Sequence, residues 1–235
     1  GACTRLKGQN AGASSALVWH PATGLFGFAS GKCVVLEDLA TQDQDVLCAV
    51  NQRAVSCVAL SGDGRFIAAG SCGLASREDP ATGAFISAAE ISLWEVGDAD
   101  VEPKCRQLLG HLGGAVQAMC FSPDSQRLVS VGNADDGMLS VWDLKHATLQ
   151  CSQRLEHGLG HAVVWAHPST IVTSGAFGAV TLWTEQQQPH GHGGPTKFQD
   201  DVLTVGHRES HQSALALCPR WLARAHGAEA VFACG

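Results

Sequence analysis

Three residues between positions 111 and 136 have the side-chain types of a hydrolase relay. His111, Ser130 and Asp136 would supply a base, a nucleophile and an orienting carboxylate, and such a relay needs an exposed nucleophile beside its base and donors for an oxyanion. Ser130, however, lies inside the apolar run LVSV, which predicts a hydroxyl in the middle of a packed strand. A structural role for these residues is therefore favoured over catalysis.

The histidine-rich segments have spacings that suit a metal but lack the remaining ligands. His207 and His211 are four residues apart, as on a zinc-binding helix, yet the order is not H-E-x-x-H and Glu209 is misplaced for a general base. The pairs within 157–161 and 190–192 are interpreted as loops, and the glycine-rich segments lack the G-x-x-x-x-G-K-[ST] order that cradles phosphate. The sequence thus predicts no catalytic residue, no metal site, no cofactor-binding residue and no cofactor.

The elements around the candidate relay form a repeating pattern. Residues 110–143 read GHLGGAVQAMCFSPDSQRLVSVGNADDGMLSVWD, with apolar runs at 115–121, 127–131 and 138–142. Ser-Pro-Asp-Ser separates the first two runs with a type I turn signal, and Asp-Gly precedes the third with a hairpin signal. Opened by Gly-His and closed by Trp-Asp, this stretch resembles one blade of a WD-repeat β-propeller.

The resemblance to WD repeats implies a structural role for the polar residues. In such repeats a histidine before the first strand, a hydroxyl on the next strand, an aspartate in the turn after it and a closing tryptophan form a buried hydrogen-bond chain. The residues in those places are His111, Ser130, Asp136 and Trp142. Because a fully satisfied buried network holds one arrangement of its members, we expect this chain to fix the blade rather than to do chemistry.

Related patterns along the chain predict further blades. Their approximate boundaries are 14–50, 54–109, 110–155, 160–206 and an incomplete 207–235. This predicts an all-β WD-repeat β-propeller with about four complete blades and the start of a fifth, its ring completed by sequence beyond residue 235. An antiparallel sandwich of evenly spaced short strands is the alternative.

The composition limits the class of protein. With 45% hydrophobic residues in a chain of 235 there is ample material for a core, and no apolar run approaches the ~18 residues of a membrane span. The net charge is −7, with 15 Lys and Arg residues and no basic cluster, which argues against binding to nucleic acid or to an anionic membrane. The 10 scattered cysteines lack C-x-x-C spacing and are expected to be reduced thiols of a cytosolic protein.

Two segments interrupt the repeating pattern. The insertion at 71–89 carries Arg77 and an apolar pair, Phe85 and Ile86, which make it a candidate interaction loop. A loop that folds back on its own blade is the alternative. The segment 185–201 is rich in Gln, Gly, His and Pro and is interpreted as an exposed, mobile connection.

The sequence of the first predicted blade shows which group of WD-repeat proteins this chain resembles. LVWHPATGLFGFASGKCVVLEDL, followed by strands ending in ISLWE and LSVWD, is similar to the large centriole and basal-body WD-repeat proteins and is related to the mitogen-activated-protein-kinase-binding WD-repeat scaffolds. The resemblance implies a non-enzymatic protein-interaction scaffold, a structural component of a microtubule-based assembly (centriole, basal body or cilium) that contributes to its assembly or stability. A soluble adaptor that assembles a protein-kinase or other multiprotein signalling complex is the alternative.

The partners implied by this resemblance are other proteins. They are ciliary, centriolar or microtubule-wall proteins, and tubulin only through another domain, because the acidic microtubule surface repels a segment of net charge −7. Neither nucleic acid nor membrane insertion is expected. The expected location is the cytoplasm, on the cytoskeleton at a centriole, basal body or cilium.

Overall fold

The computed structural model of the chain is built from strands and turns. It describes residues 17–49, 52–73, 89–96, 103–111, 113–155, 162–174, 179–186, 197–204, 215–216 and 233–234. Within these ranges no helix is long and apolar enough to cross a membrane.

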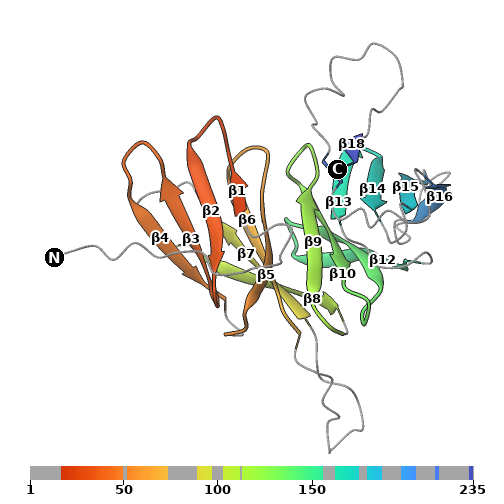
Figure 1. The fold of residues 1–235 in the computed structure, drawn as a ribbon, viewed down its shortest axis with the longest axis horizontal. Helices are drawn as coiled ribbons and strands as arrows, with labels where there is room; N and C mark the ends of the chain where they lie inside the picture. Colours follow the sequence, from red (N-terminus) through yellow and green to blue (C-terminus); the bar gives the residue numbers. More distant parts are fainter. Residues whose placement is uncertain are drawn as a thin grey trace, which may run out of the picture.

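Four antiparallel sheets of four strands each follow one another along the described chain (Figure 1). Blade 1 contains β1 (Leu17–Trp19), β2 (Leu25–Ser30), β3 (Cys33–Asp38) and β4 (Gln44–Cys48). Blade 2 contains β5 (Val55–Leu60), β6 (Phe66–Ser71), β7 (Ala89–Glu95) and β8 (Cys105–His111).

The second pair of sheets repeats the same strand order. Blade 3 contains β9 (Val116–Phe121), β10 (Arg127–Gly132), β11 (Met138–Asp143) and β12 (Thr148–Arg154). Blade 4 contains β13 (Ala162–His167), β14 (Thr170–Ser174), β15 (Ala179–Glu185) and β16 (Phe198–Thr204). A fifth sheet pairs β17 (Leu215–Ala216) with β18 (Ala233–Cys234).

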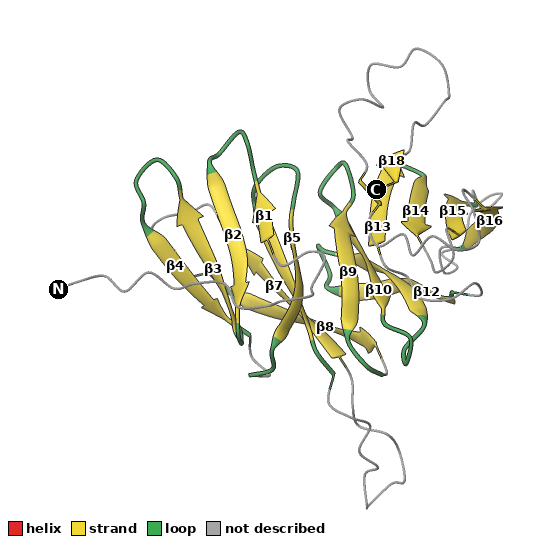
Figure 2. Ribbon diagram, viewed as in Figure 1, coloured by secondary structure: helices red, strands yellow, loops and turns green. Residues whose placement is uncertain are grey.

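Within each four-stranded sheet every strand pairs with the next one in the sequence. The sheets stand beside one another, and the first strand of each contacts the first strand of its neighbour: β1 contacts β5, β5 contacts β9, and β9 contacts β13 (Figure 2). The first strands are therefore the inner edges of the blades, and the fourth strands are the outer edges.

A separate hydrophobic core fills each gap between neighbouring blades. The core between blades 1 and 2 includes Val34, Leu36, Ile67 and Trp94. The core between blades 2 and 3 includes Ile91, Leu93, Val116 and Trp142. The core between blades 3 and 4 includes Val129, Val141, Ile171 and Trp183.

Strand β6 shows why an uninterrupted apolar run forms the middle of a blade. All six of its residues, FIAAGS, are buried. Ile67 and Ala69 face blade 1, whereas Phe66 and Ala68 face blade 3. Because side chains alternate across a strand, a strand packed on both faces must be apolar at consecutive positions.

The apolar runs identified in the sequence correspond to the inner three strands of the blades, while the outer strands are additional. β4 and β12 are largely exposed, and their sequences QDVLC and TLQCSQR mix polar and apolar residues. Such an edge strand is held by its backbone ladder and buries only part of one face. Hydrophobic patterning gives it little signal.

Two interpretations of the sequence need correction. The segment 185–201 is not an exposed connection throughout, because Phe198 begins β16 and is buried against blade 3. The boundary predicted between residues 109 and 110 falls inside β8, which continues to His111 and pairs it with Ala89. Gly-His therefore opens the repeat in sequence but closes the preceding sheet in space.

Candidate functional site

The structure brings together all four residues of the predicted polar chain. His111 Nδ1 lies 2.6 Å from Asp136 Oδ2, and His111 Nε2 lies 2.8 Å from Ser130 Oγ. The indole N–H of Trp142 donates to the same Ser130 Oγ over 2.8 Å. The imidazole and the hydroxyl have no exposed surface. The chain runs from Asp136 through the imidazole and the hydroxyl to the indole.

Residues from two different sheets build this polar chain. His111 ends β8 of blade 2, whereas Ser130 and Trp142 lie on β10 and β11 of blade 3. Asp136 lies in the turn between these two strands, where it also accepts the backbone N–H of Gly113 over 3.2 Å. These hydrogen bonds therefore join blade 2 to blade 3 across their interface.

The close approach of the Trp142 ring requires glycine at position 110, directly before His111. A Cβ at Gly110 would lie 2.6 Å from Cη2 of Trp142, which is closer than carbon atoms approach without strain. The indole therefore packs directly over the backbone of β8. The Gly-His pair supplies the space for the indole and the imidazole that joins the chain.

The hydrogen-bond directions leave no free nucleophile. In the tautomer with its proton on Nδ1, His111 donates to the Asp136 carboxylate, and Nε2 accepts the proton of the Ser130 hydroxyl. That hydroxyl in turn accepts the indole proton of Trp142. Ser130 is fully buried, its hydroxyl is hydrogen-bonded to His111 and Trp142, and a substrate carbonyl has no approach to it.

Blade 4 contains a shorter version of the chain that sequence reasoning missed. Trp183 Nε1 donates to Thr173 Oγ1 over 2.9 Å, both groups being buried. Thr173 stands two residues beyond Ile171, the cross-strand partner of Trp183, just as Ser130 stands two beyond the partner of Trp142. A hydroxyl at that offset is the sequence signal for this contact. Blade 2 has Ala69 at the corresponding place.

Two of the turns between the first and second strands of a blade have the same polar construction. Ser61 Oγ donates to Asp63 Oδ1 over 2.6 Å, and Ser122 Oγ donates to Asp124 Oδ1. Partial burial raises the pKa of Asp63 and of Asp124, but the hydrogen bonds from these serines and from following backbone N–H groups outweigh it. Each pKa is therefore below its usual 3.8.

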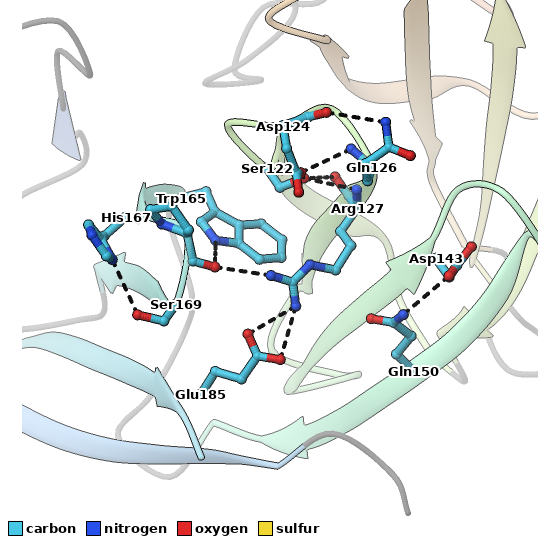
Figure 3. Close-up of polar contacts among 11 residues, drawn as sticks. Ser122, Asp124, Gln126, Arg127, Asp143, Gln150, Trp165, His167, Ser169 and Glu185 are labelled. Atoms are coloured by element: carbon cyan, nitrogen blue, oxygen red, sulfur yellow. Dashed lines mark hydrogen bonds and ion pairs between the residues drawn. The ribbon is translucent and has the colours of Figure 1, made fainter. Parts of the chain in front are cut away.

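Arg127 joins blade 3 to blade 4 through three contacts (Figure 3). Its Nη1 lies 3.2 and 3.1 Å from the two carboxylate oxygens of Glu185, and its Nη2 donates to the carbonyl of Pro168 over 3.0 Å. The guanidinium carbon also lies 4.6 Å from the ring centroid of Trp165. The planar guanidinium suits this combination of stacking and forked donation.

A groove of about 510 Å³ follows the inner strands of the blades. Its lining is mainly apolar and includes Leu17, Val58, Leu60, Met119, Phe121 and Trp165. These residues come from β1, β5, β9 and β13. The groove is therefore a property of the assembled blades and not of any single sheet.

Several residues singled out in the sequence lie outside the described part of the chain. This applies to the candidate interaction loop, Arg77, Phe85 and Ile86, and to the histidine pair His207 and His211. Among the side chains that the structure describes, no three His, Cys, Asp or Glu residues are grouped so as to hold a metal ion.

Comparison with known sequences identifies the repeat. The family model described as "WD domain, G-beta repeat" matches residues 46–75 and 103–143. WD repeat-containing protein 90 of Mus musculus is 31% identical over 97% of this chain, which covers 11% of that protein. Centriole proteome protein 16 of Chlamydomonas reinhardtii is 33% identical over 78% of this chain, which covers 10% of that protein.

A further relative is named for the cilium. Cilia- and flagella-associated protein 52 of Sus scrofa is 28% identical over 82% of this chain. The chain covers 29% of that protein, so it spans a minor part of the length of each of these relatives.

Solved structures agree with the fold. The crystal structure of the RRP9 WD40 repeats gives a TM-score of 0.55 at 18% identity and covers 74% of this chain and 49% of that chain. The structure of U3-55K gives a TM-score of 0.54 at 18% identity, with 75% and 50% covered. The predicted all-β WD-repeat fold is confirmed. The chain carries WD40 repeats, folds as blades of a WD40 propeller, and is similar in sequence to a protein named WD repeat-containing protein 90 and to proteins named for the centriole and the cilium.

Proposed function

We propose that the chain is a non-enzymatic protein-interaction scaffold that contributes to the assembly or stability of a centriole, basal body or cilium. One observation carries this proposal: the similarity to Centriole proteome protein 16 extends over 78% of the chain at 33% identity. The relative named Cilia- and flagella-associated protein 52 supports the same setting, and the relative named WD repeat-containing protein 90 supports the scaffold fold.

The geometry of the polar residues supports a scaffold rather than an enzyme. Among the described residues, those that most resemble a catalytic relay are His111, Ser130 and Asp136. Their side chains are buried, and His111 is hydrogen-bonded to both of the others. Their hydrogen-bonding capacity is used to join two sheets. The groove along the inner strands has a mainly apolar lining, which suits contact with protein more than chemistry on a polar substrate.

The net charge bears on how such a scaffold meets a microtubule. A chain of net charge −7 is repelled by an acidic surface of tubulin. Our proposal is therefore that this chain contacts a partner protein of the assembly and that attachment to tubulin occurs through another part of the protein. Co-sedimentation of the isolated chain with microtubules at low salt is expected to leave it in the supernatant.

The decisive test is localisation of the whole protein that contains this chain. Tagged protein in ciliated cells is expected at centrioles or axonemes, with wall proteins or tubulin recovered by proximity labelling. A matched protein lacking residues 17–204 is expected to lose part of this set of neighbours. A diffuse cytosolic signal with kinases recovered would instead support a soluble signalling adaptor.

The insertion loop remains our proposed contact site for the partner. Replacing Phe85 and Ile86 with serine is expected to reduce recovery of one neighbour while leaving thermal stability unchanged. The matched control is the same exchange at Val46, an apolar residue on the exposed outer strand of blade 1. Equal recovery of every neighbour by both variants would exclude the loop as the contact.

A further inference from the structure

Blade 1 contains two cysteines directly opposite each other on neighbouring strands. Cys33 on β3 pairs in register with Cys48 on β4, and their sulfur atoms lie 2.7 Å apart. Both are free thiols in the structure. This distance is shorter than an ordinary contact between unbonded sulfurs, so only a small movement separates the pair from a covalent bond.

The backbone around the pair has the register that a cross-strand disulfide needs. The N–H of Ala49 donates to the carbonyl of Lys32, which makes Lys32 and Ala49 a hydrogen-bonded pair. The adjacent pair, Cys33 and Cys48, is therefore non-hydrogen-bonded, and the Cα atoms of such pairs are about 4.5 Å apart. Disulfides span Cα separations of about 4.4–6.8 Å, so neither strand has to shift its register.

The exposed side chain of Cys48 makes the pair accessible from solution. Cys33 and Cys48 share a face with Phe28, Val35 and Val46, as the cross-strand register shows. Blade 2 packs on the opposite face, where Val34, Leu36 and Leu47 are buried. A small oxidant in solution therefore reaches the pair through the exposed Cys48.

The other described thiols have different surroundings. Of the seven cysteines whose side chains the structure describes, Cys48 is the exposed one. Cys57 is fully buried in the core between blades 2 and 3, and burial raises its pKa to about 12. Burial also raises the pKa of Cys120. Thiols of this kind are rarely ionised near neutral pH and react slowly.

The two members of the pair have different parts in an oxidation. Burial, the hydrogen bond to Cys48 and the negative charge of an ionised Cys48 raise the pKa of Cys33 to about 11. Cys48 is exposed and Cys33 is half-buried, so Cys48 is the first sulfur to react.

From this geometry we infer that Cys33 and Cys48 form a redox modification site that hydrogen peroxide converts to a cross-strand disulfide. The Cys48 thiolate attacks one peroxide oxygen: an S–O bond forms, the O–O bond breaks, and hydroxide leaves to be protonated to water. The Cys33 sulfur then attacks the Cys48 sulfur. The S–S bond forms, the S–O bond breaks, and the leaving hydroxide takes the Cys33 proton as water. The two sulfurs lose two electrons, and one peroxide yields two waters.

The structural effect of this bond is local to the outer edge of blade 1. β4 is an exposed edge strand joined to the sheet by one ladder. A covalent link to β3 limits its fraying, because the two strands then separate only when the bond is reduced. This inference is independent of the proposed function.

The test is mass spectrometry of the full chain after reduction, treatment with a small molar excess of peroxide, alkylation and digestion without reductant. The digestion uses a protease that cleaves at Asp and Glu, because residues 34–47 contain these acids but no Lys or Arg. The expected product is a linked peptide pair containing Cys33 and Cys48, two hydrogens lighter than the reduced peptides together, and dithiothreitol separates it. The linked pair should form before Cys57, Cys105 or Cys120 is modified. Recovery of alkylated Cys33 and Cys48 when other thiols are oxidised would overturn the inference, as would sulfinic acid at Cys48 without a linked peptide.

Two variants and one further measurement separate chemistry from folding. Cys33→Ser is expected to leave a sulfenic acid at Cys48 that dimedone captures, whereas the matched Cys105→Ser exchange is expected to leave the linkage intact. Hydrogen exchange is measured on the unsubstituted chain, so its result does not depend on whether a variant folds. Amides of residues 44–48 are expected to exchange several-fold more slowly after oxidation, and unchanged rates would contradict the predicted effect of the bond on the fraying of β4.

Discussion

Ser130 Oγ is the point at which the polar chain between blades 2 and 3 meets the hydrophobic core. It contacts the imidazole of His111 and the indole of Trp142 within hydrogen-bond distance, and all three side chains are buried. Loss of one member removes a hydrogen-bond partner from a buried polar atom of its neighbour, which costs more than the bond itself. The four residues are therefore expected to be sensitive to substitution one by one.

Trp142→Ala tests the centre of this arrangement. Removal of a fully buried indole is expected to lower the free energy of unfolding by about 3–5 kcal/mol. The matched control is Trp19→Ala, because Trp19 is 60% exposed, and its expected loss is under about 1 kcal/mol. Urea unfolding followed by fluorescence and circular dichroism measures both, and equal losses would contradict the prediction.

Gly110→Ala tests the close approach of the indole to β8. The added Cβ would lie 2.6 Å from the Trp142 ring, so the ring or the strand must move, at an expected cost of about 1–3 kcal/mol. Gly62→Ala is the control, since the nearest atom to its added Cβ is 3.9 Å away. A change within about 0.5 kcal/mol is expected there. A neutral Gly110 variant would mean that the indole packs elsewhere.

Two elements, the turn with Asp63 and the turn with Asp124, carry an acid-dependent part of the stability. Because the folded-state pKa of each is below the usual 3.8, its contribution is present above that value and is lost as the pH falls through the lower folded-state pKa. The Asp63→Asn, Asp124→Asn variant is therefore expected to differ most from the unsubstituted chain at pH 6–7. Thermal unfolding between pH 7 and 3 should show the difference shrinking on acidification, and a constant difference would refute it.

The ion pair between Arg127 on β10 and Glu185 on β15 provides a second test at the level of elements. The side chains of Arg127 and Glu185 are 19% and 27% exposed, whereas those of the Arg65–Glu95 pair are 59% and 55% exposed. A double-mutant cycle with Gln replacements is expected to give a coupling below about 1 kcal/mol for the exposed pair. The Arg127–Glu185 coupling should exceed it, because solvent screens that pair less. The reverse order would show that the blade interface does not depend on this pair.

For the whole molecule, the parts that the sequence predicts well are those with a strong periodic or compositional signal. The closing tryptophans, the Gly-His pair and the turn residues place the inner strands and the members of the polar chain. The outer strands β4 and β12 lack such a signal because most of their side chains face solvent, where packing does not require apolar residues at regular positions. The Thr173–Trp183 contact and the Cys33–Cys48 pair depend on cross-strand register, which is set by the assembled sheet.

His111 gives the array of blades a particular response to mechanical force. It belongs to the outer strand of blade 2 by backbone pairing and to blade 3 by side-chain bonding. Tension applied through the polypeptide between β8 and β9 therefore acts on two sets of bonds at this residue, the backbone ladder between β7 and β8 and the side-chain bonds to Asp136 and Ser130.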